Sequence, residues 1–374
     1  MTAQWRWLEL GGVDGPTMVN VFVALAATVG SGESPPTVVL LHPSSPFANV
    51  GFHQEAEREL DLDYCRAKGI PVVRRVVGGG AILDGPWEQD YMVVVPQGAP
   101  GTEQGVAGFY EHYLRPIRST LARLGVTAER SGLNDLAAGG RKVSANGALS
   151  LTGSWVLAGD LLLDLDPEAL SRVLRVPDEK FRGKLAQGMA EWLTSVRALT
   201  GRTPDRSEVG RLLREEFAAA LGTPMVPGEL SGEERASLEQ LRASRSKDEW
   251  TFQRDRTHPR LSQAPAEGRA VKISHEAVLA RIDRKAGKLV RVTLLHRHGR
   301  IEEVEFSGDF FTQPFDADLA ELEATLKGAP VDEAALRASI GGWVEARGVR
   351  LLGATADDLA GAVAAAAALS PASL

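Results

Sequence analysis

The chain is organised around residues 134–147, which read Asn-Asp-Leu-Ala-Ala-Gly-Gly-Arg-Lys-Val-Ser-Ala-Asn-Gly. Its Gly139-Gly140 pair is typical of a tight β-hairpin turn, which would place Arg141 and Lys142 on the second strand. A lysine fixed on a strand beside small side chains suits the binding of a phosphate or a carboxylate. The alternative interpretation is a polar surface hairpin without a ligand.

A second glycine-rich stretch precedes it at 74–81, Arg-Arg-Val-Val-Gly-Gly-Gly-Ala. A strand-like run leads into Gly78–Gly80, and three glycines suggest a close approach to the main chain or a positive φ. Exposed N–H groups in such a turn can bind an anion, and Arg74 and Arg75 would add positive charge. The spacing matches neither a Walker loop nor a dinucleotide fingerprint. A plain tight turn is the alternative.

Length and composition place the chain among soluble globular proteins. Its 374 residues allow one large domain plus a small one, and 44% hydrophobic residues with 24% charged residues are ordinary. A net charge of -7 argues against a nucleic-acid binder with a globally basic surface. The single cysteine, the lack of a signal-peptide pattern and the short apolar runs predict a cytoplasmic protein without a membrane segment. We expect a monomer.

Alternating strand and helix patterns in the first two thirds of the chain indicate an α/β or α+β domain with a mixed sheet. Residues 48–54 read as one strand and residues 55–68 as one amphipathic helix. The long helical pattern at 105–125 should kink or split at Pro116.

A change of pattern predicts a second domain. Residues 1–250 form the expected catalytic domain, 251–268 a polar linker with prolines, and 269–374 a small α+β domain with an Ala-rich tail. Within the last segment, residues 289–295 and 301–306 are expected to pair as a hairpin.

The sequence offers neither a metal cluster nor a covalent nucleophile. Of seven histidines only His296 and His298 are close, and they fall in the hairpin of the small domain. Cys65 lies on a helical pattern and is expected to be a packed small hydrophobe. Acyl transfer through a thioester on the enzyme needs a reactive cysteine, and no other cysteine exists.

Taken together, these stretches resemble the ordered motifs of lipoate–protein ligases, in the biotin/lipoate protein ligase superfamily. The resemblance covers about residues 1–345, and Gly308-Asp-Phe-Phe311 is similar to part of the ligase accessory domain. It implies an α+β fold, with a large mixed-sheet catalytic domain and a smaller C-terminal α+β accessory domain. The segments that carry it are 49–54, 61–65, 74–81, 134–136, 140–144 and 159–164.

The resemblance also implies an activity, ATP-dependent activation of lipoate to lipoyl-AMP and transfer to a lysine of a lipoyl-domain protein. That acceptor would be a 2-oxoacid dehydrogenase subunit, a glycine-cleavage carrier or a specialised lipoate-binding protein. Lys142 would be catalytic, bridging the carboxyl oxygen and the α-phosphate, and Asp135 would bind Mg²⁺. The residues expected to bind the acyl-adenylate are Arg74, Arg75, Gly78, Gly79, Gly80, Ala81, Asn134, Asp135, Ser144 and Gly159.

The chain also departs from the pattern of that family. Val77 stands where a serine is frequent, and Asp84 lies where a histidine is frequent. His-Gly-Thr is replaced by Ala158-Gly159-Asp160, and Ser144-Ala-Asn-Gly147 replaces a common Ser-Gly-Ser/Asn-Ala. These changes indicate a divergent branch and leave the choice between lipoate and octanoate open.

Three other functions compete with the ligase. One is an octanoyltransferase that takes its acyl group from an acyl carrier protein without ATP, although a cysteine near Asn134 is missing for the cysteine-dependent version. A biotin ligase fits the Arg-Arg-x-x-Gly-Gly-Gly-Ala form less well. A non-catalytic scaffold that binds lipoyl domains would explain the substituted positions, but Lys142 and Asn134-Asp135 are retained.

Overall fold

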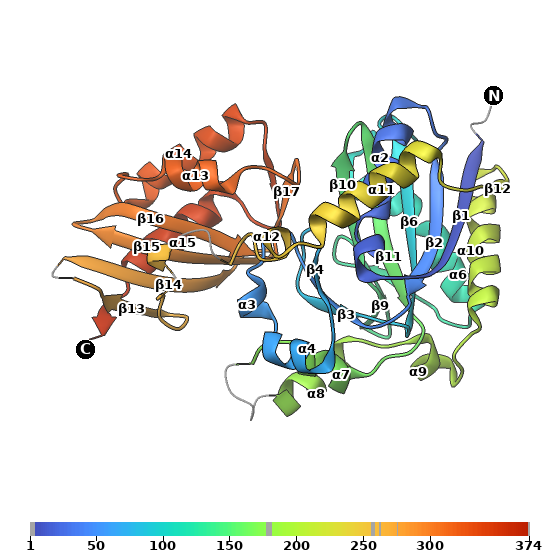
Figure 1. Cartoon of the computed structure of the whole chain (residues 1–374), viewed down its shortest axis with the longest axis horizontal. Helices are drawn as coiled ribbons and strands as arrows, with labels where there is room; N and C mark the ends of the chain where they lie inside the picture. The colour runs from blue at the N-terminus through green and yellow to red at the C-terminus, as the bar shows by residue number, and fades with distance from the viewer. Residues whose placement is uncertain (1–3, 177–181, 256–258, 262, 275, 373–374) are drawn as a thin grey trace. The chain divides into compact units, whose positions relative to one another are not determined.

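The structure, a computed structural model, describes residues 4–176, 182–255, 259–261, 263–274 and 276–372 (Figure 1). The chain forms two compact units. Unit 1 comprises Met1–Asn49, Leu60–Arg75 and Ala81–Thr251, and unit 2 comprises Val50–Glu59, Val76–Gly80 and Phe252–Leu374. Two short segments of the N-terminal half therefore group with the C-terminal residues. The division at 1–250, 251–268 and 269–374 stays a prediction.

Unit 1 is built on a mixed sheet. The strands of this sheet are β1 (Trp5–Val13), β2 (Thr37–Pro43), β6 (Glu88–Pro96), β10 (Asn146–Leu151), β11 (Ser154–Leu162) and β12 (Met225–Pro227). Within the described residues their order is β10-β11-β6-β2-β1-β12. The strand β1 pairs in parallel with β2 and β12, and the other pairs are antiparallel. The predicted mixed-sheet α+β fold is confirmed.

Helices cover both faces of this sheet. The helices of unit 1 are α1 (Gly15–Met18), α2 (Val21–Ser31), α4 (Leu62–Lys68), α5 (Gly105–Tyr113), α6 (Arg115–Arg123), α7 (Pro167–Val173), α8 (Arg182–Trp192), α9 (Val196–Thr200), α10 (Arg206–Leu221), α11 (Gly232–Arg245) and α12 (Asp248–Thr251). Successive side chains of a strand point to opposite faces. Tyr91 and Val93 share a core with α5, α6 and α10, whereas α2 packs against β6 on the face of Met92 and Val94. Figure 1 shows α11 beside α2.

Two small sheets complete unit 1. Their strands are β3 (Phe47–Val50), β4 (Val72–Arg74) and β5 (Ile82–Asp84), in the order β4-β3-β5, and β7 (Glu129–Ser131), β8 (Asp135–Ala138) and β9 (Arg141–Ser144), in the order β7-β8-β9. The predicted strand at 48–54 is wrong beyond Val50. Gly51 and Gln54 exchange hydrogen bonds there, from the Gly51 N–H to Gln54 Oε1 and from the Gln54 N–H to the Gly51 carbonyl, which makes a turn.

Two helix predictions have different outcomes. The split at Pro116 is confirmed, because α5 ends before Leu114 and Pro116 lies in the first turn of α6, where its missing N–H costs nothing. The single helix at 55–68 is wrong. It is divided into α3 (Ala56–Glu59) and α4, and Asp61 caps α4 by accepting a 2.9 Å hydrogen bond from the Tyr64 N–H.

Unit 2 is a smaller α+β body. Its described elements are α3, the 3-10 helix η2 (Pro259–Leu261), β13 (Arg269–Lys272), β14 (Ala277–Lys285), β15 (Leu289–Arg297), β16 (Arg300–Gly308), β17 (Phe311–Gln313), β18 (Arg350–Leu352), β19 (Pro371–Ala372), α13 (Leu319–Thr325), α14 (Glu333–Ala346) and α15 (Ala356–Ala367). The predicted hairpin is β15 and β16, within a sheet of order β16-β15-β14-β13-β19. Phe306, Leu322, Ile340 and Val363 join this sheet to the helices in one core.

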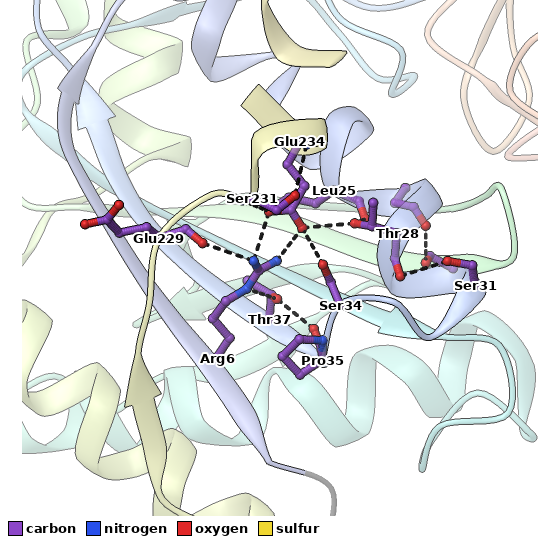
Figure 2. A network of polar contacts seen from close by, with 12 residues as sticks. Arg6, Leu25, Thr28, Ser31, Ser34, Pro35, Thr37, Glu229, Ser231 and Glu234 are labelled. Carbon is purple, nitrogen blue, oxygen red and sulfur yellow. Dashed lines mark hydrogen bonds and ion pairs between the residues drawn. The ribbon is translucent and has the colours of Figure 1, made fainter. Parts of the chain in front are cut away.

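A buried ion pair fastens α11 to the sheet of unit 1 (Figure 2). The Arg6 guanidinium binds both carboxylate oxygens of Glu234, at 2.6 and 2.9 Å. Thr28 of α2 and Ser34 donate hydrogen bonds to Glu234 Oε1, and the Ser231 N–H donates to Oε2. The side chain of Glu234 is fully buried, so these donors replace its hydration. Three segments distant in sequence therefore meet at one carboxylate.

No helix among the described residues is long and apolar enough to span a membrane.

Candidate functional site

The predicted hairpin is present in unit 1. The strands β8 and β9 pair antiparallel, and Gly139 and Gly140 join them with φ of 57° and 78°. Two successive positive φ values are typical of the type I′ turn that matches the twist of a hairpin. Lys142 of β9 forms an ion pair with Asp135 of β8, with 2.7 Å between Nζ and Oδ2. The lysine side chain stays 36% exposed, so a ligand can reach the ammonium group.

A hydrogen-bonded polar network lies beside this ion pair. Asn134 donates through Nδ2 to the Asn146 carbonyl and, over 3.2 Å, to Asp135 Oδ1. The Tyr91 hydroxyl donates to Asn146 Oδ1, and Asn146 Nδ2 donates to Ser144 Oγ at 3.1 Å. Tyr91, Ser144 and Asn146 are buried, so the network fixes the hairpin to the main sheet.

Gly159 lies in the middle of this network. The register of β10, β11 and β6 places Asn146, Gly159 and Tyr91 side by side. A Cβ on Gly159 would approach Asn146 Oδ1 to 2.1 Å and the Tyr91 hydroxyl oxygen to 2.7 Å, so only glycine fits. The structure therefore brings together five predicted residues: Asn134, Asp135, Lys142, Ser144 and Gly159.

Tyr91 and Asn146 were not among the predicted site residues. Asn146 lies inside the opening stretch, where its amide was a usable signal. Tyr91 begins the apolar run at 91–96 within β6, and nothing in such a run distinguishes a hydroxyl that serves a site from one at the edge of a core.

Acidic side chains gather next to the network. Asp160 follows Gly159 on β11 and lies opposite Asp90 of β6, and Asp84 ends β5. The Asp160 carboxylate accepts one hydrogen bond from the Ala145 N–H at 2.9 Å, and Asp84 accepts one from Asn49 Nδ2 at 2.7 Å. Several carboxylates thus share one partly buried region with few donors.

The pKa values of these carboxyls are raised. Burial raises the pKa of Asp160 to about 7, with the charge of Asp84 adding to this rise and the charge of Lys142 opposing it. Burial likewise raises the pKa of Asp84 to about 6, against the hydrogen bond from Asn49. Burial also raises the pKa of Asp90 well above its usual range, and the charges of Asp84 and Asp160 raise it further. Like charges close together disfavour the ionised form.

The other predicted residues of unit 1 have structural contacts. Arg74 is 1% exposed, its Nε donates to the Thr251 carbonyl at 2.8 Å, and its own carbonyl accepts from Trp250 Nε1. It therefore joins β4 to α12 rather than presenting a charge at the surface. Arg75 donates to the Asn49 carbonyl at 3.2 Å, and its charge lowers the pKa of Asp84, although burial outweighs it. Ala81 lies just before β5, half-buried.

The triple glycine belongs to unit 2. A Cβ on Gly78 would approach the Phe310 carbonyl to 2.6 Å and the Phe311 ring to 2.8 Å. The Gly79 N–H donates to the Asp309 carbonyl at 3.1 Å. A Cβ on Gly80 would meet nothing within 4 Å. Packing within unit 2 therefore accounts for the small size of Gly78, and ligand binding by this loop stays a prediction.

Neither a reactive thiol nor a metal cluster is found at the hairpin. Cys65 of α4 is buried, and burial together with the charge of Asp61 raises the pKa of its thiol to about 11. Asp135, the predicted Mg²⁺ ligand, forms the ion pair with Lys142, and its role as a metal ligand stays a prediction. In the part of the chain that the structure describes, no three His, Cys, Asp or Glu side chains are arranged to hold a metal ion.

Comparison with known proteins places this site in a family. Residues 20–218 match the family described as the lipoyl protein ligase A/B catalytic domain. A curated relative from Kyrpidia tusciae, octanoyltransferase LipM, is 32% identical over 272 residues, which cover 67% of this chain and 99% of that protein.

Solved structures agree on the fold. A bipartite lipoate protein ligase from Thermoplasma acidophilum, studied with its E2 lipoyl domain, superposes with a TM-score of 0.61 at 24% identity, over 67% of this chain and 96% of its own. LipL1 of P. falciparum in complex with lipoate superposes with a TM-score of 0.66 at 12% identity, over 92% of this chain and 98% of its own. The second match extends the similarity of fold across most of the chain.

These comparisons correct one prediction. The expected ATP-dependent activation of lipoate through an acyl-adenylate is wrong, because the curated relative is an octanoyltransferase. A transferase moves an acyl group that is already activated, whereas a ligase activates the acid with ATP. The predicted roles of ATP and Mg²⁺ lose their support with it.

Proposed function

The chain belongs to the lipoyl protein ligase A/B catalytic domain family, and we propose from this premise that it is an ATP-independent octanoyltransferase. It moves an octanoyl group from the thioester of an acyl carrier protein to a lysine of a lipoyl-domain protein. The transferase relative supports the acyl group and the reaction class. The E2 lipoyl domain studied with the Thermoplasma ligase supports the acceptor class.

The observation that carries the proposal is the accessible Lys142 ammonium, held by Asp135 beside a rigid polar network. In acyl transfer, negative charge develops on the thioester carbonyl oxygen. A positioned cation at that oxygen stabilises the transition state more than the ground state. Asp135 keeps the ammonium in place, and the small Gly159 leaves room for the approach of Tyr91 and Asn146 behind it.

The reaction balances without a covalent enzyme intermediate. The acceptor nitrogen attacks the thioester carbon, a C–N bond forms, the C–S bond breaks, and the carrier thiolate leaves and takes up a proton. A thiol with a pKa of about 11 that is buried on α4 is a poor nucleophile at neutral pH, so Cys65 takes no part. The acyl group passes directly from donor to acceptor.

The test uses octanoyl-loaded acyl carrier protein, an unmodified lipoyl domain and the full-length chain without nucleotide. Mass spectrometry should show the lipoyl domain gaining an octanoyl amide, and Cys65→Ala should transfer at the wild-type rate. A requirement for ATP, or an octanoyl thioester trapped on Cys65, would overturn the proposal. Binding of the lipoyl domain without transfer would overturn it too and favour a non-catalytic scaffold.

A further inference from the structure

Two of the acidic residues beside the hairpin stand at positions where the chain departs from the ligase pattern. Asp84 and Asp160 stand where the pattern has histidine and threonine, and they are distant in sequence. The fold brings them together, since each lies close enough to raise the pKa of the other or of Asp90. Asp160 and Asp90 are directly opposite on neighbouring strands. Asp160 and Asp90 are partly buried as whole residues, whereas the Oδ2 atom of Asp90 is shielded from solvent.

Two buried acceptor atoms in this region have no donor among the described residues. Asn49 is 4% exposed and donates through Nδ2 to Asp84, yet its Oδ1 accepts no hydrogen bond. Asp90 Oδ2 is also buried without a partner. Buried polar atoms are nearly always satisfied, so each of these two acceptors can take a hydrogen bond from water or from a ligand. These two acceptors, Asn49 Oδ1 and Asp90 Oδ2, lack a donor among the described residues.

The neighbouring cations are engaged elsewhere. Lys142 is paired with Asp135, and Arg75 donates to the Asn49 carbonyl. Arg206 donates to the carbonyls of Glu88 and Pro86 and to Gln89 Oε1. The described carboxylates are not arranged as metal ligands. The fitting ligand is therefore a group with several N–H donors, a positive charge and no acceptor, which describes an alkylammonium.

We propose that Asp160, with Asp84 and Asp90, binds the ammonium group of the acceptor lysine and that Asp160 takes its proton. This inference rests on the proposed octanoyl transfer. A lysine is protonated at neutral pH and cannot attack a thioester until it loses a proton. One proton passes from the ammonium to the Asp160 carboxylate, the nitrogen attacks the thioester carbon, and its second proton goes to the leaving thiolate. Asp160 then releases its proton to solvent.

The electrostatic surroundings suit this role. A general base works best when its pKa lies near the working pH, and burial raises the pKa of Asp160 to about 7. The arriving ammonium also neutralises charge among the carboxylates, so substrate binding lowers their mutual repulsion. The groups that face Asp160 are Asp84, Asp90, Asp135, Glu88, Tyr91 and Lys142, while Arg206 faces Asp90 and Glu88, and Arg75 faces Asp84.

The test compares wild type with Asp160→Asn on two acceptors, a lipoyl-domain lysine and hydroxylamine, which is neutral at pH 7 and needs no base. We expect Asp160→Asn to lower the rate with lysine by about 10²-fold at pH 7. The loss should shrink as the pH rises toward the lysine pKa of about 10.4. The rate with hydroxylamine should be unchanged. Asp164→Asn, in the exposed ion pair with Arg197, serves as the matched control and should behave as wild type.

The outcomes separate the two proposals. If wild type transfers to neither acceptor, the octanoyltransferase proposal fails and the proton-acceptor role falls with it. If wild type transfers and Asp160→Asn keeps the wild-type pH profile with lysine, only the proton-acceptor role is overturned. An equal loss on both acceptors also overturns it, because that pattern marks a structural defect, which a thermal melt would confirm.

Discussion

Unit 1 contains two acidic sites that are opposite in character, Glu234 under α11 and Asp160 beside the hairpin. Burial by itself would raise the pKa of Glu234, but hydrogen bonds from Arg6, the Ser231 N–H and Ser34 outweigh it and lower the pKa to about 2 (Figure 2). Asp160 accepts a hydrogen bond from one backbone N–H and faces other carboxylates, so burial raises its pKa to about 7.

The difference shows that donors, rather than burial, decide whether a carboxylate in this fold is charged. Glu234 is ionised and both of its carboxylate oxygens accept hydrogen bonds, so it can hold α11 in place but cannot exchange a proton near neutral pH. Asp160 has few hydrogen-bond donors and a pKa near neutral pH. Its ionisation destabilises the fold at high pH, and such a pKa suits proton transfer. Substitutions at either site should change this difference in measurable ways.

The largest effect should come from Arg6→Met, which leaves the Glu234 carboxylate buried without its cation. Removing one partner of a buried ion pair costs about 3–5 kcal/mol. The denaturant midpoint at pH 7 should fall accordingly, with the slope unchanged. The double variant Arg6→Met with Glu234→Leu should recover much of this loss, because it removes the uncompensated charge. A loss below about 1 kcal/mol in Arg6→Met would show that the pair behaves as a surface ion pair.

Lys142→Met tests the cation of the hairpin beside Asp160. It removes the proposed oxyanion donor and should lower kcat for octanoyl transfer by about 10²–10³-fold. Its melting temperature should change little, since the lysine side chain is 36% exposed. Arg141→Met, on the same strand, is the matched control and should keep its activity. Equal activity of the two variants would remove Lys142 from the reaction.

Local turn chemistry made the hairpin predictable from the sequence, because Gly139-Gly140 specifies its turn without help from distant residues. The ion pair of Lys142 with Asp135 follows from the short connection between their strands. The clustering of Asp84, Asp90 and Asp160 was not predictable from the sequence. Asp160 meets Asp90 through the register of β11 on β6, and periodicity along the chain does not reveal that register.

Sequence patterns also could not assign short segments to units. The triple glycine reads as a site loop by its composition, yet Gly78 and Gly79 group with Phe310 and Asp309 of unit 2. The Arg6–Glu234 pair joins residues more than two hundred positions apart and leaves no local signal. Contacts of this kind become visible only when the chain is folded.

Ser34→Ala should make Glu234 more like Asp160. It deletes the 2.8 Å hydrogen bond to Glu234 Oε1, and losing a hydrogen bond to a charged group costs about 1.5–3 kcal/mol. The pKa of Glu234 in the folded state should rise, so the acid-induced loss of stability, which begins near the unfolded value of 4.5, should be smaller and end at a higher pH. Urea titrations from pH 2 to pH 5 would measure this shift. Ser31→Ala, whose hydroxyl donates to the Thr28 carbonyl instead, is the control and should leave the acid limb in place.

Replacing Asp160 with Asn should instead increase the stability of the fold. A carboxyl with a raised pKa keeps its proton in the folded state between the unfolded value of 3.8 and about 7, whereas the unfolded chain has released it. The stability of wild type therefore falls as the pH rises through that window. The asparagine can still accept the hydrogen bond from the Ala145 N–H, and it removes the charge.

Asp160→Asn should accordingly match wild type near pH 4 and exceed it in stability above pH 7, with the difference growing between those two values. Melting temperatures measured across this range give the difference directly. Glu234→Gln should show the opposite sign, losing stability relative to wild type at pH 7 and converging on it as the pH falls toward 2. If the two difference curves had the same sign, the contrast between a carboxylate with many hydrogen-bond donors and one with few would not hold.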